Sequence, residues 1–168
     1  MRKYRSRTAL TNYKPTIAIV YASATGHTES LTQMVADALV RQGAQPDVFR
    51  VKEFNLAELC CYDIVLVGTY TWMNGEIPKQ LHGLYEAMEH QDKTPITGVF
   101  GTGDRCFATY CGAVDLFRDM LHATTVLAAT LKVEQMPSAD DCLRCDAFAE
   151  SVLTKYSHHK GLLPATNS

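Results

Sequence analysis

Several features that would place the protein in a common class are absent from its sequence. No apolar stretch approaches the roughly 18 residues that a membrane-spanning helix requires. The N-terminal residues include Arg2, Lys3, Arg5 and Arg7 but no apolar run of the kind found in secretory signals. We therefore expect a cytoplasmic protein with no membrane partner.

Cysteines are present, but not at the spacing of a metal site. Cys142 and Cys145 form a single C-x-x-C, and two adjacent histidines follow at 158 and 159. A zinc site would need a second such pair, or two histidines about three to five residues apart. We expect reduced thiols and no bound metal. Of the other cysteines, we expect Cys60, Cys61 and Cys106 to be packing residues.

Charge is unevenly distributed along the chain. Residues 1–15 carry five Lys or Arg and no acid, whereas residues 16–157 carry ten Lys or Arg and all eighteen Asp and Glu. An acidic body disfavours nucleic acid and favours basic protein partners. We interpret residues 1–15 as a basic, disordered extension, residues 16–157 as the folded domain, and residues 158–168 as a flexible tail.

Buried strands and amphipathic helices alternate along the chain. Apolar runs predict strands at 16–21, 63–68, 96–101 and 125–133, and a more alternating run at 47–54 predicts an edge strand. Helical patterns lie between and after these runs, at 31–39, 55–60, 78–88, 114–121 and 145–156. This alternation predicts an α/β fold, with a doubly wound five-stranded parallel sheet covered by helices on both faces.

Three loops rich in glycine, serine and threonine follow predicted strands. They read "SATGHT" (23–28), "TYTWMNGE" (69–76) and "GTGDRCFATYCG" (101–112). The carboxyl ends of parallel strands lie at one edge of the sheet, and doubly wound folds bind ligands there, at the topological switch point. We expect the three loops to meet and to form a binding site.

The first loop predicts a phosphate site. Backbone N–H groups and the positive end of the next helix dipole attract an anion, Gly26 allows a tight curl, and Ser23, Thr25 and Thr28 add hydroxyl donors. The alternative is an ordinary capped turn with Ser23 or Thr28 as the N-cap. The chain has neither G-x-x-x-x-G-K-[ST] nor G-x-G-x-x-G, and the loop has no Lys or Arg. A single terminal phosphate therefore fits better than a nucleoside triphosphate or a dinucleotide.

Aromatic residues in the other two loops predict a flat ring. Trp72 is the only tryptophan, and Phe107 and Tyr110 lie in the third loop beside Gly103 and Asp104. A loop tryptophan is commonly a half-buried lid on neighbouring helices. Two aromatic loops on either side of a phosphate site could instead clamp a flat ring system with polar edges.

Together, "SATGHT", "GTYTW…GE" and "GTGD…F…YCGAVD" resemble the flavodoxin family, of the short-chain type, over residues 16–156. Flavodoxin is itself a standard example of a doubly wound fold with flavin mononucleotide (FMN) at its switch point. The resemblance implies a sheet in the order 2-1-3-4-5 and non-covalently bound FMN. It also implies a monomeric, low-potential one-electron carrier that serves an NAD(P)H-dependent reductase and an acceptor enzyme.

The resemblance also implies which residues hold FMN. Residues 23–28 would bind the phosphate, while Trp72 would stack on the inner face of the isoalloxazine and Phe107 on its outer face. The implied cofactor contacts are Ser23, Ala24, Thr25, Gly26, His27, Thr28, Tyr70, Thr71, Trp72, Met73, Asn74, Gly75, Thr102, Gly103, Asp104, Phe107, Tyr110 and Cys111. No catalytic acid, base or nucleophile is implied.

Three departures from the family pattern stand out. Phe107 occupies the place of the usual outer tyrosine, and the overall charge is less negative than is common in the family. Met73-Asn74 replaces the usual Gly-Asp, whose peptide flips when the flavin gains a proton at N5. Because Met adopts positive φ less readily than Gly, we expect weaker stabilisation of the one-electron-reduced flavin.

Two other interpretations of the function remain open. One is an FMN-dependent oxidoreductase, such as a quinone reductase or an activator of ribonucleotide reductase. The other is a flavin-free interaction or signalling domain on the same fold, although a phosphoreceiver would need acidic residues where Ser23 and Gly68 stand.

Overall fold

The computed structural model describes residues 14–106 and 109–161. Its five parallel strands are β1 (Ile17–Tyr21), β2 (Pro46–Arg50), β3 (Ile64–Tyr70), β4 (Ile96–Gly103) and β5 (Val126–Glu134). They form one sheet in the order β2-β1-β3-β4-β5. This confirms the predicted fold and strand order.

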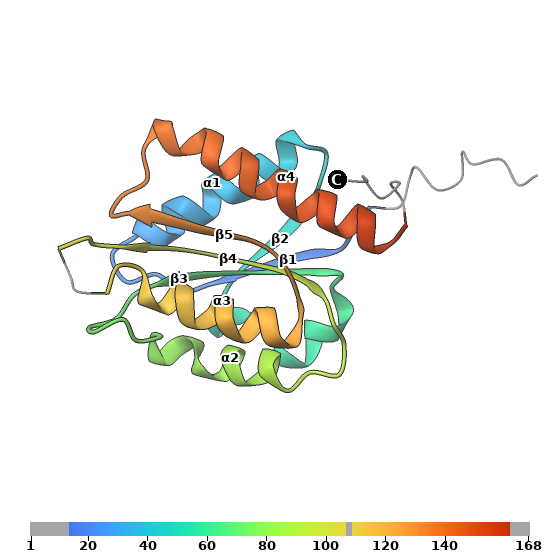
Figure 1. The fold of residues 1–168 in the computed structure, drawn as a ribbon, viewed down its shortest axis with the longest axis horizontal. Helices are drawn as coiled ribbons and strands as arrows, with labels where there is room; N and C mark the ends of the chain where they lie inside the picture. Colours follow the sequence, from blue (N-terminus) through green and yellow to red (C-terminus); the bar gives the residue numbers. More distant parts are fainter. Residues whose placement is uncertain (1–13, 107–108, 162–168) are drawn as a thin grey trace, which may run out of the picture.

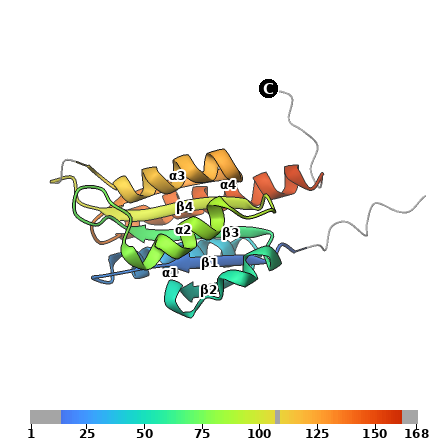
Figure 2. The same cartoon turned by 90° about the horizontal axis from the view of Figure 1, so that it is seen from below.

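Helices cover both faces of the sheet (Figures 1 and 2). One face carries α1 (His27–Arg41) and α4 (Cys142–His159), and the other carries α2 (His82–Glu89) and α3 (Gly112–Thr124). Alternate side chains of the central strands enter opposite cores: Ile17 and Ile19 pack with α1 and α4, whereas Ala18 and Val20 pack with α2 and α3. Burial on both faces explains why these strands are continuously apolar.

Edge strand β2 is more exposed than central strand β1, as its more alternating sequence predicts. Its residues are partly or fully exposed, whereas every residue of β1 is buried. The switch point lies between β1 and β3, because the chain leaves β1 toward one side of the sheet and returns on the other. The loops after β1, β3 and β4 lie together at the same end of the sheet (Figures 1 and 2).

Some local predictions were wrong. The segment predicted as a second helix at 55–60 is a 3-10 helix, Leu56–Cys61, which begins where the Asn55 side chain accepts a hydrogen bond from the Ala57 N–H. Cys60, Cys61 and Cys106 are exposed rather than packed, because they lie on that outer turn and in the loop after β4. The last helix runs through His159, and the domain boundary at 157 stays a prediction.

Two kinds of feature are absent from residues 14–106 and 109–161. No helix there is long and apolar enough to cross a membrane. Within the same residues, no three His, Cys, Asp or Glu side chains form a cluster suited to a metal ion.

Candidate cofactor site

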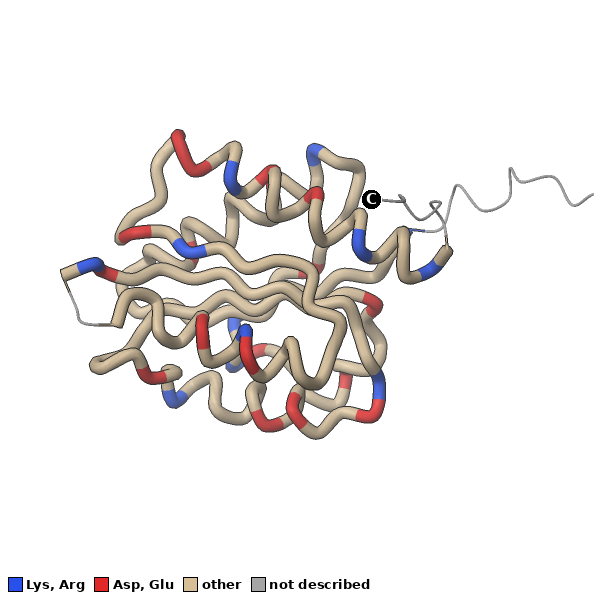
Figure 3. The backbone as a smooth tube through the Cα atoms, in the orientation of Figure 1, with Lys and Arg blue, Asp and Glu red and all other residues tan. Residues whose placement is uncertain are grey.

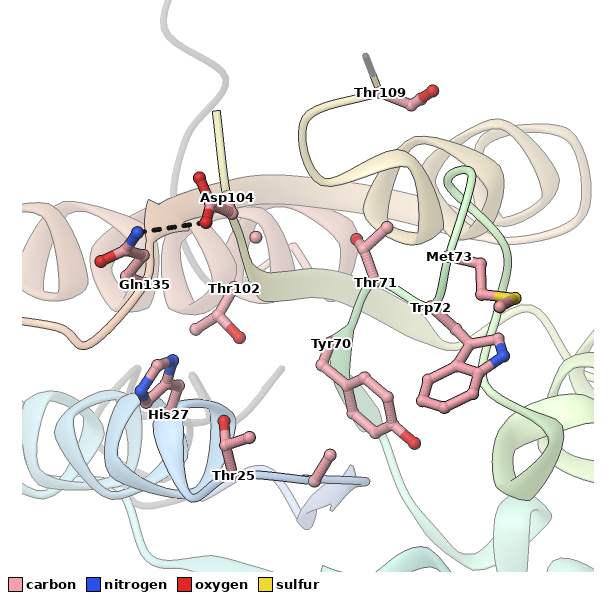
Figure 4. Close-up of a pocket in the computed structure, with 12 residues that line it drawn as sticks. Thr25, His27, Tyr70, Thr71, Trp72, Met73, Thr102, Asp104, Thr109 and Gln135 are labelled. Atoms are coloured by element: carbon pink, nitrogen blue, oxygen red, sulfur yellow. Dashed lines mark hydrogen bonds between the residues drawn. The ribbon is translucent and has the colours of Figure 1, made fainter. Parts of the chain in front are cut away.

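A cavity of about 390 Å³ opens at the carboxyl ends of the strands, within the range typical of small-ligand sites. The three loops that follow β1, β3 and β4 supply most of its wall, and the end of β5 supplies the rest (Figure 4). The lining residues are Ala24, Thr25, His27, Tyr70, Thr71, Trp72, Met73, Thr102, Gly103, Asp104, Thr109 and Gln135.

The first loop turns into α1 at a left-handed glycine. Gly26 has φ of 89° and a Cβ there would meet nothing within 4 Å, so the backbone conformation is what requires glycine. Ser23 Oγ accepts hydrogen bonds from the N–H groups of Gly26 (3.1 Å) and Glu29 (3.3 Å). Ser23 thus caps part of the helix, while the N–H groups of His27 and Thr28 have no carbonyl partner within it.

The hydroxyl of Thr28 does not face the cavity. It is buried and lies 2.8 Å from Thr102 Oγ1, so that it joins the start of α1 to the end of β4. Thr102 lines the cavity and Thr28 supports it from behind.

The second loop is a small hairpin. The N–H of Trp72 donates to the carbonyl of Glu76 (3.0 Å), and the N–H of Glu76 donates to the carbonyl of Trp72 (2.8 Å). Met73, at φ of 40°, and Gly75, at φ of 93°, make the turn between them. Trp72 is 47% exposed although its ring lines the cavity and meets Tyr70 edge-on, with ring centroids 6.4 Å apart. A ring with this much exposed face is available for stacking.

Gly75 sets how closely the second loop approaches the third. A Cβ at Gly75 would lie 2.7 Å from Thr109 Cγ2, and a Cβ at Gly112 would lie 2.7 Å from the Gly75 Cα. Both glycines are therefore required by contact between the two loops, and Gly75 also by its positive φ.

The third loop carries a fixed carboxylate. Asp104 Oδ1 accepts a hydrogen bond from the Cys106 N–H (2.8 Å), and Oδ2 accepts one from Gln135 Nε2 (3.2 Å; Figure 4). The Cys106 N–H, together with the Cys106 thiol and Gln135, lowers the pKa of Asp104 below its usual value. Asp104 is therefore an anion at neutral pH.

The predicted residues divide into three groups. Those that line the cavity are Ala24, Thr25, His27, Tyr70, Thr71, Trp72, Met73, Thr102, Gly103 and Asp104. Those that lie beside it without lining it are Ser23, Gly26, Thr28, Asn74, Gly75, Tyr110 and Cys111. Phe107 lies outside the described residues.

Two residues behind the third loop illustrate the second group. The Tyr110 ring packs on the core beneath α3, with Arg105 Cζ 5.2 Å from its centroid, because the chain turns inward at this point. Cys111 is fully buried at φ of 51°, and burial raises the pKa of its thiol to about 11. A buried neutral thiol contributes to packing rather than to chemistry.

Sequence reasoning missed Thr109 and Gln135. Gln135 follows β5 at φ of 52°, its N–H donates to the Gly103 carbonyl at 2.7 Å, and its side chain holds Asp104. The same rule that selected the other loops applies to it, because the carboxyl end of β5 lies at the same edge of the sheet.

The cavity has neutral donors and one unmatched hydroxyl. None of the described residues in its wall is Lys or Arg, and His27 is the only one that can become a cation. The buried Thr71 Oγ1 has no hydrogen-bond partner within the described structure. A buried polar atom without a partner is costly, so a ligand with a polar edge beside Thr71 would fit this wall.

Comparison with known proteins identifies the family. The family model described as Flavodoxin matches residues 19–145. A Bacillus subtilis (strain 168) protein named "Probable flavodoxin 1" is 34% identical over 80% of this chain and 88% of its own length. The flavodoxin of Maridesulfovibrio salexigens is 36% identical over 73% of this chain and 88% of its own length.

The chain belongs to the flavodoxin family.

Solved structures agree with this assignment. The flavodoxin of Streptococcus pneumonia TIGR4 superposes with a TM-score of 0.78 at 32% identity, covering 83% of this chain and 98% of that one. Oxidised flavodoxin 1 from Bacillus cereus superposes with a TM-score of 0.76 at 26% identity, covering 83% and 97%. This flavodoxin is accordingly a low-potential electron carrier with FMN as its cofactor and redox proteins as its partners.

The described residues fit FMN. A helix N-terminus without lysine or arginine suits one phosphate, the half-exposed Trp72 suits a flat ring, and the unpartnered Thr71 hydroxyl suits a polar ring edge.

Proposed function

We propose that this flavodoxin holds FMN across its three loops, with the phosphate at residues 23–28. The positive end of α1 and the free N–H groups of His27 and Thr28 support this placement. Thr28 would act through its backbone, since its hydroxyl is paired with Thr102. Thr25 would add a hydroxyl from the cavity wall.

The flavin ring would lie against Trp72, with Phe107 on its outer face as the family resemblance implies. The exposed face of Trp72 supports the first contact. Thr71, Thr102 and the 103–104 backbone would meet the polar edge of the ring, and the family's backbone contact at Cys111 stays a prediction. FMN supplies one-electron chemistry, and these residues bind it, orient it and shield one side of it from water.

The fixed charges favour a low potential. The Asp104 carboxylate lies in the cavity wall, and Glu76 closes the hairpin that carries Trp72. Carboxylates near the ring disfavour added negative charge on it.

The proposed partners are an NAD(P)H-dependent reductase and an acceptor enzyme with basic docking surfaces, and the proposed working state is a monomer. Acidic side chains outnumber basic ones on α2 and α3, beside the second and third loops (Figure 3). The proposed compartment is the cytoplasm, because six cysteines without a zinc spacing suit a reducing environment.

Anaerobic stepwise reduction followed by absorbance tests the assignment. We expect FMN bound at one per chain, two separable one-electron steps, and slow NADPH oxidation unless a reductase is added. Rapid NADPH oxidation by the pure protein would indicate an enzyme instead, and a colourless protein that does not take up micromolar FMN would contradict the site.

A further inference from the structure

We propose that His27 makes the affinity of this flavodoxin for FMN depend on pH, because it lies in the cavity wall at the proposed phosphate site and histidine is a side chain that can gain a positive charge near neutral pH. The inference rests on the proposed position of the phosphate at residues 23–28.

The position of His27 supports this role. It is the first residue of α1, next to the left-handed Gly26, and its ring stands in the cavity wall beside Thr25 (Figure 4). The ring is only partly exposed, so its charge is less screened than that of a free surface histidine. Among the described lining residues, no other side chain can become a cation. A charged His27 would therefore be the one positive side chain among these residues.

The surrounding charges leave the phosphate as the decisive partner. Asp104 also lines the cavity, and its carboxylate accepts hydrogen bonds from Gln135 (Figure 4) and from the Cys106 N–H. Two ion pairs engage charged groups on α1 and in the third loop, namely Glu29 with Arg50 at 2.5 Å and Arg105 with Glu134 at 3.4 Å. A phosphate dianion at this place would attract a positively charged side chain.

Linkage then fixes the sign of the effect. A phosphate beside the imidazole favours its charged form, so binding would take up a proton and be tighter at lower pH. Affinity therefore falls as the pH rises from about 6 to 8. Below about pH 6 the FMN phosphate itself becomes protonated, so variants must be compared at the same pH.

Two variants separate charge from shape. His27→Asn keeps a small polar side chain that is neutral at every pH, and His27→Lys keeps a positive charge throughout this range. The dissociation constant is measured by diluting FMN-loaded protein at pH 6 and pH 8 and following the fluorescence of released FMN. We expect wild type to bind about tenfold more tightly than His27→Asn at pH 6, since one pKa unit corresponds to tenfold, and about equally at pH 8. His27→Lys should bind tightly at both values.

Riboflavin, which lacks the phosphate, provides the ligand control. In competition against FMN, its own affinity should show the same pH dependence in wild type and in His27→Asn. Equal pH dependence of FMN binding in these two proteins, or weak binding by His27→Lys at pH 6, would overturn the proposal. A pH effect that riboflavin shares would overturn it as well. Failure of all three proteins to hold FMN would instead overturn the proposed function.

Discussion

Thr28 Oγ1 and Thr102 Oγ1 lie 2.8 Å apart in the buried region behind the cavity, joining residues 74 positions apart in the sequence. The pair connects the helix that begins the phosphate loop to the strand that ends in the third loop. Neither hydroxyl has another side-chain partner within the described structure, so each depends on the other.

Replacing one member of this pair should cost more than replacing both. Thr28→Val leaves the Thr102 hydroxyl buried and unpaired, and we expect the free energy of unfolding to fall by about 1–3 kcal/mol. The double variant Thr28→Val with Thr102→Val should lose less than the sum of the two single losses. Urea denaturation of the four proteins in a double-mutant cycle measures this, and strictly additive losses would contradict the coupling.

Contact between the second and third loops should depend on Gly75. Gly75→Ala adds a Cβ at φ of 93° that would lie 2.7 Å from Thr109 Cγ2. Gly43→Ala is a matched control, because Gly43 has φ of 86° but open space around it. We expect both variants to lose about 1 kcal/mol from backbone strain. Only Gly75→Ala should also lose FMN affinity, by about tenfold, measured by FMN fluorescence. Equal affinities in the two variants would show that the loop contact does not shape the site.

The accuracy of sequence prediction followed the strength of the pattern. The β1, β3 and β4 strands are buried on both faces and therefore read as unbroken apolar runs, which the sequence makes easy to find. The 56–61 segment has the apolar spacing of a helix but only six residues, and such short pieces close as 3-10 turns.

The parts of the candidate site that lie in the first three loops could be predicted from the composition of those loops. Glycine, hydroxyl and aromatic residues mark the first three loops, whereas Gln135 reaches the cavity only through its left-handed backbone after β5. Thr28 and Tyr110 lie in segments that form the cavity, but their side chains do not line it. The direction of a side chain depends on the local backbone conformation. Sequence composition does not record that conformation.

Buried thiols should make the protein less stable at alkaline pH. Burial raises the pKa of Cys111 and of Cys145 to about 11, from 9.0. A raised folded-state pKa gives stability that is complete below the unfolded value and is lost as the pH rises through the folded one. We expect the free energy of unfolding to fall between about pH 9 and 11, and less steeply in Cys145→Ala. Identical slopes in wild type and variant would contradict this.

The same burial predicts which thiols react. Cys60, Cys61, Cys106 and Cys142 are exposed and should be labelled in the native protein by a thiol reagent. Cys111 and Cys145 should be labelled only after unfolding, and peptide mapping by mass spectrometry distinguishes the two sets.

Met73 should limit the separation of the two electron steps. It has φ of 40° and is 69% exposed, so its conformation carries backbone strain without compensating burial. Because Met adopts positive φ less readily than Gly, we expect Met73→Gly to stabilise the one-electron-reduced flavin and to move the two one-electron potentials apart by about 40 mV, which is ~1 kcal/mol for one electron. Met73→Ala keeps a Cβ and should resemble wild type. Potentials of Met73→Gly that match those of wild type would contradict this role of Met73.

Thr71 should affect stability and FMN binding in opposite directions. Its buried hydroxyl has no partner in the described structure, so Thr71→Val should leave the FMN-free protein equally stable or more stable by up to about 1–2 kcal/mol. If this hydroxyl pairs with the polar edge of the flavin, the same variant should bind FMN about tenfold more weakly. Thr69→Val is the matched control, because the Thr69 hydroxyl is buried two residues earlier, at the end of β3, but donates to the Tyr70 carbonyl at 2.7 Å. That control should destabilise the FMN-free protein, and urea denaturation with and without FMN separates the two variants. If FMN-free Thr71→Val loses as much stability as Thr69→Val, the Thr71 hydroxyl already has a partner in the absence of FMN, and the prediction is wrong.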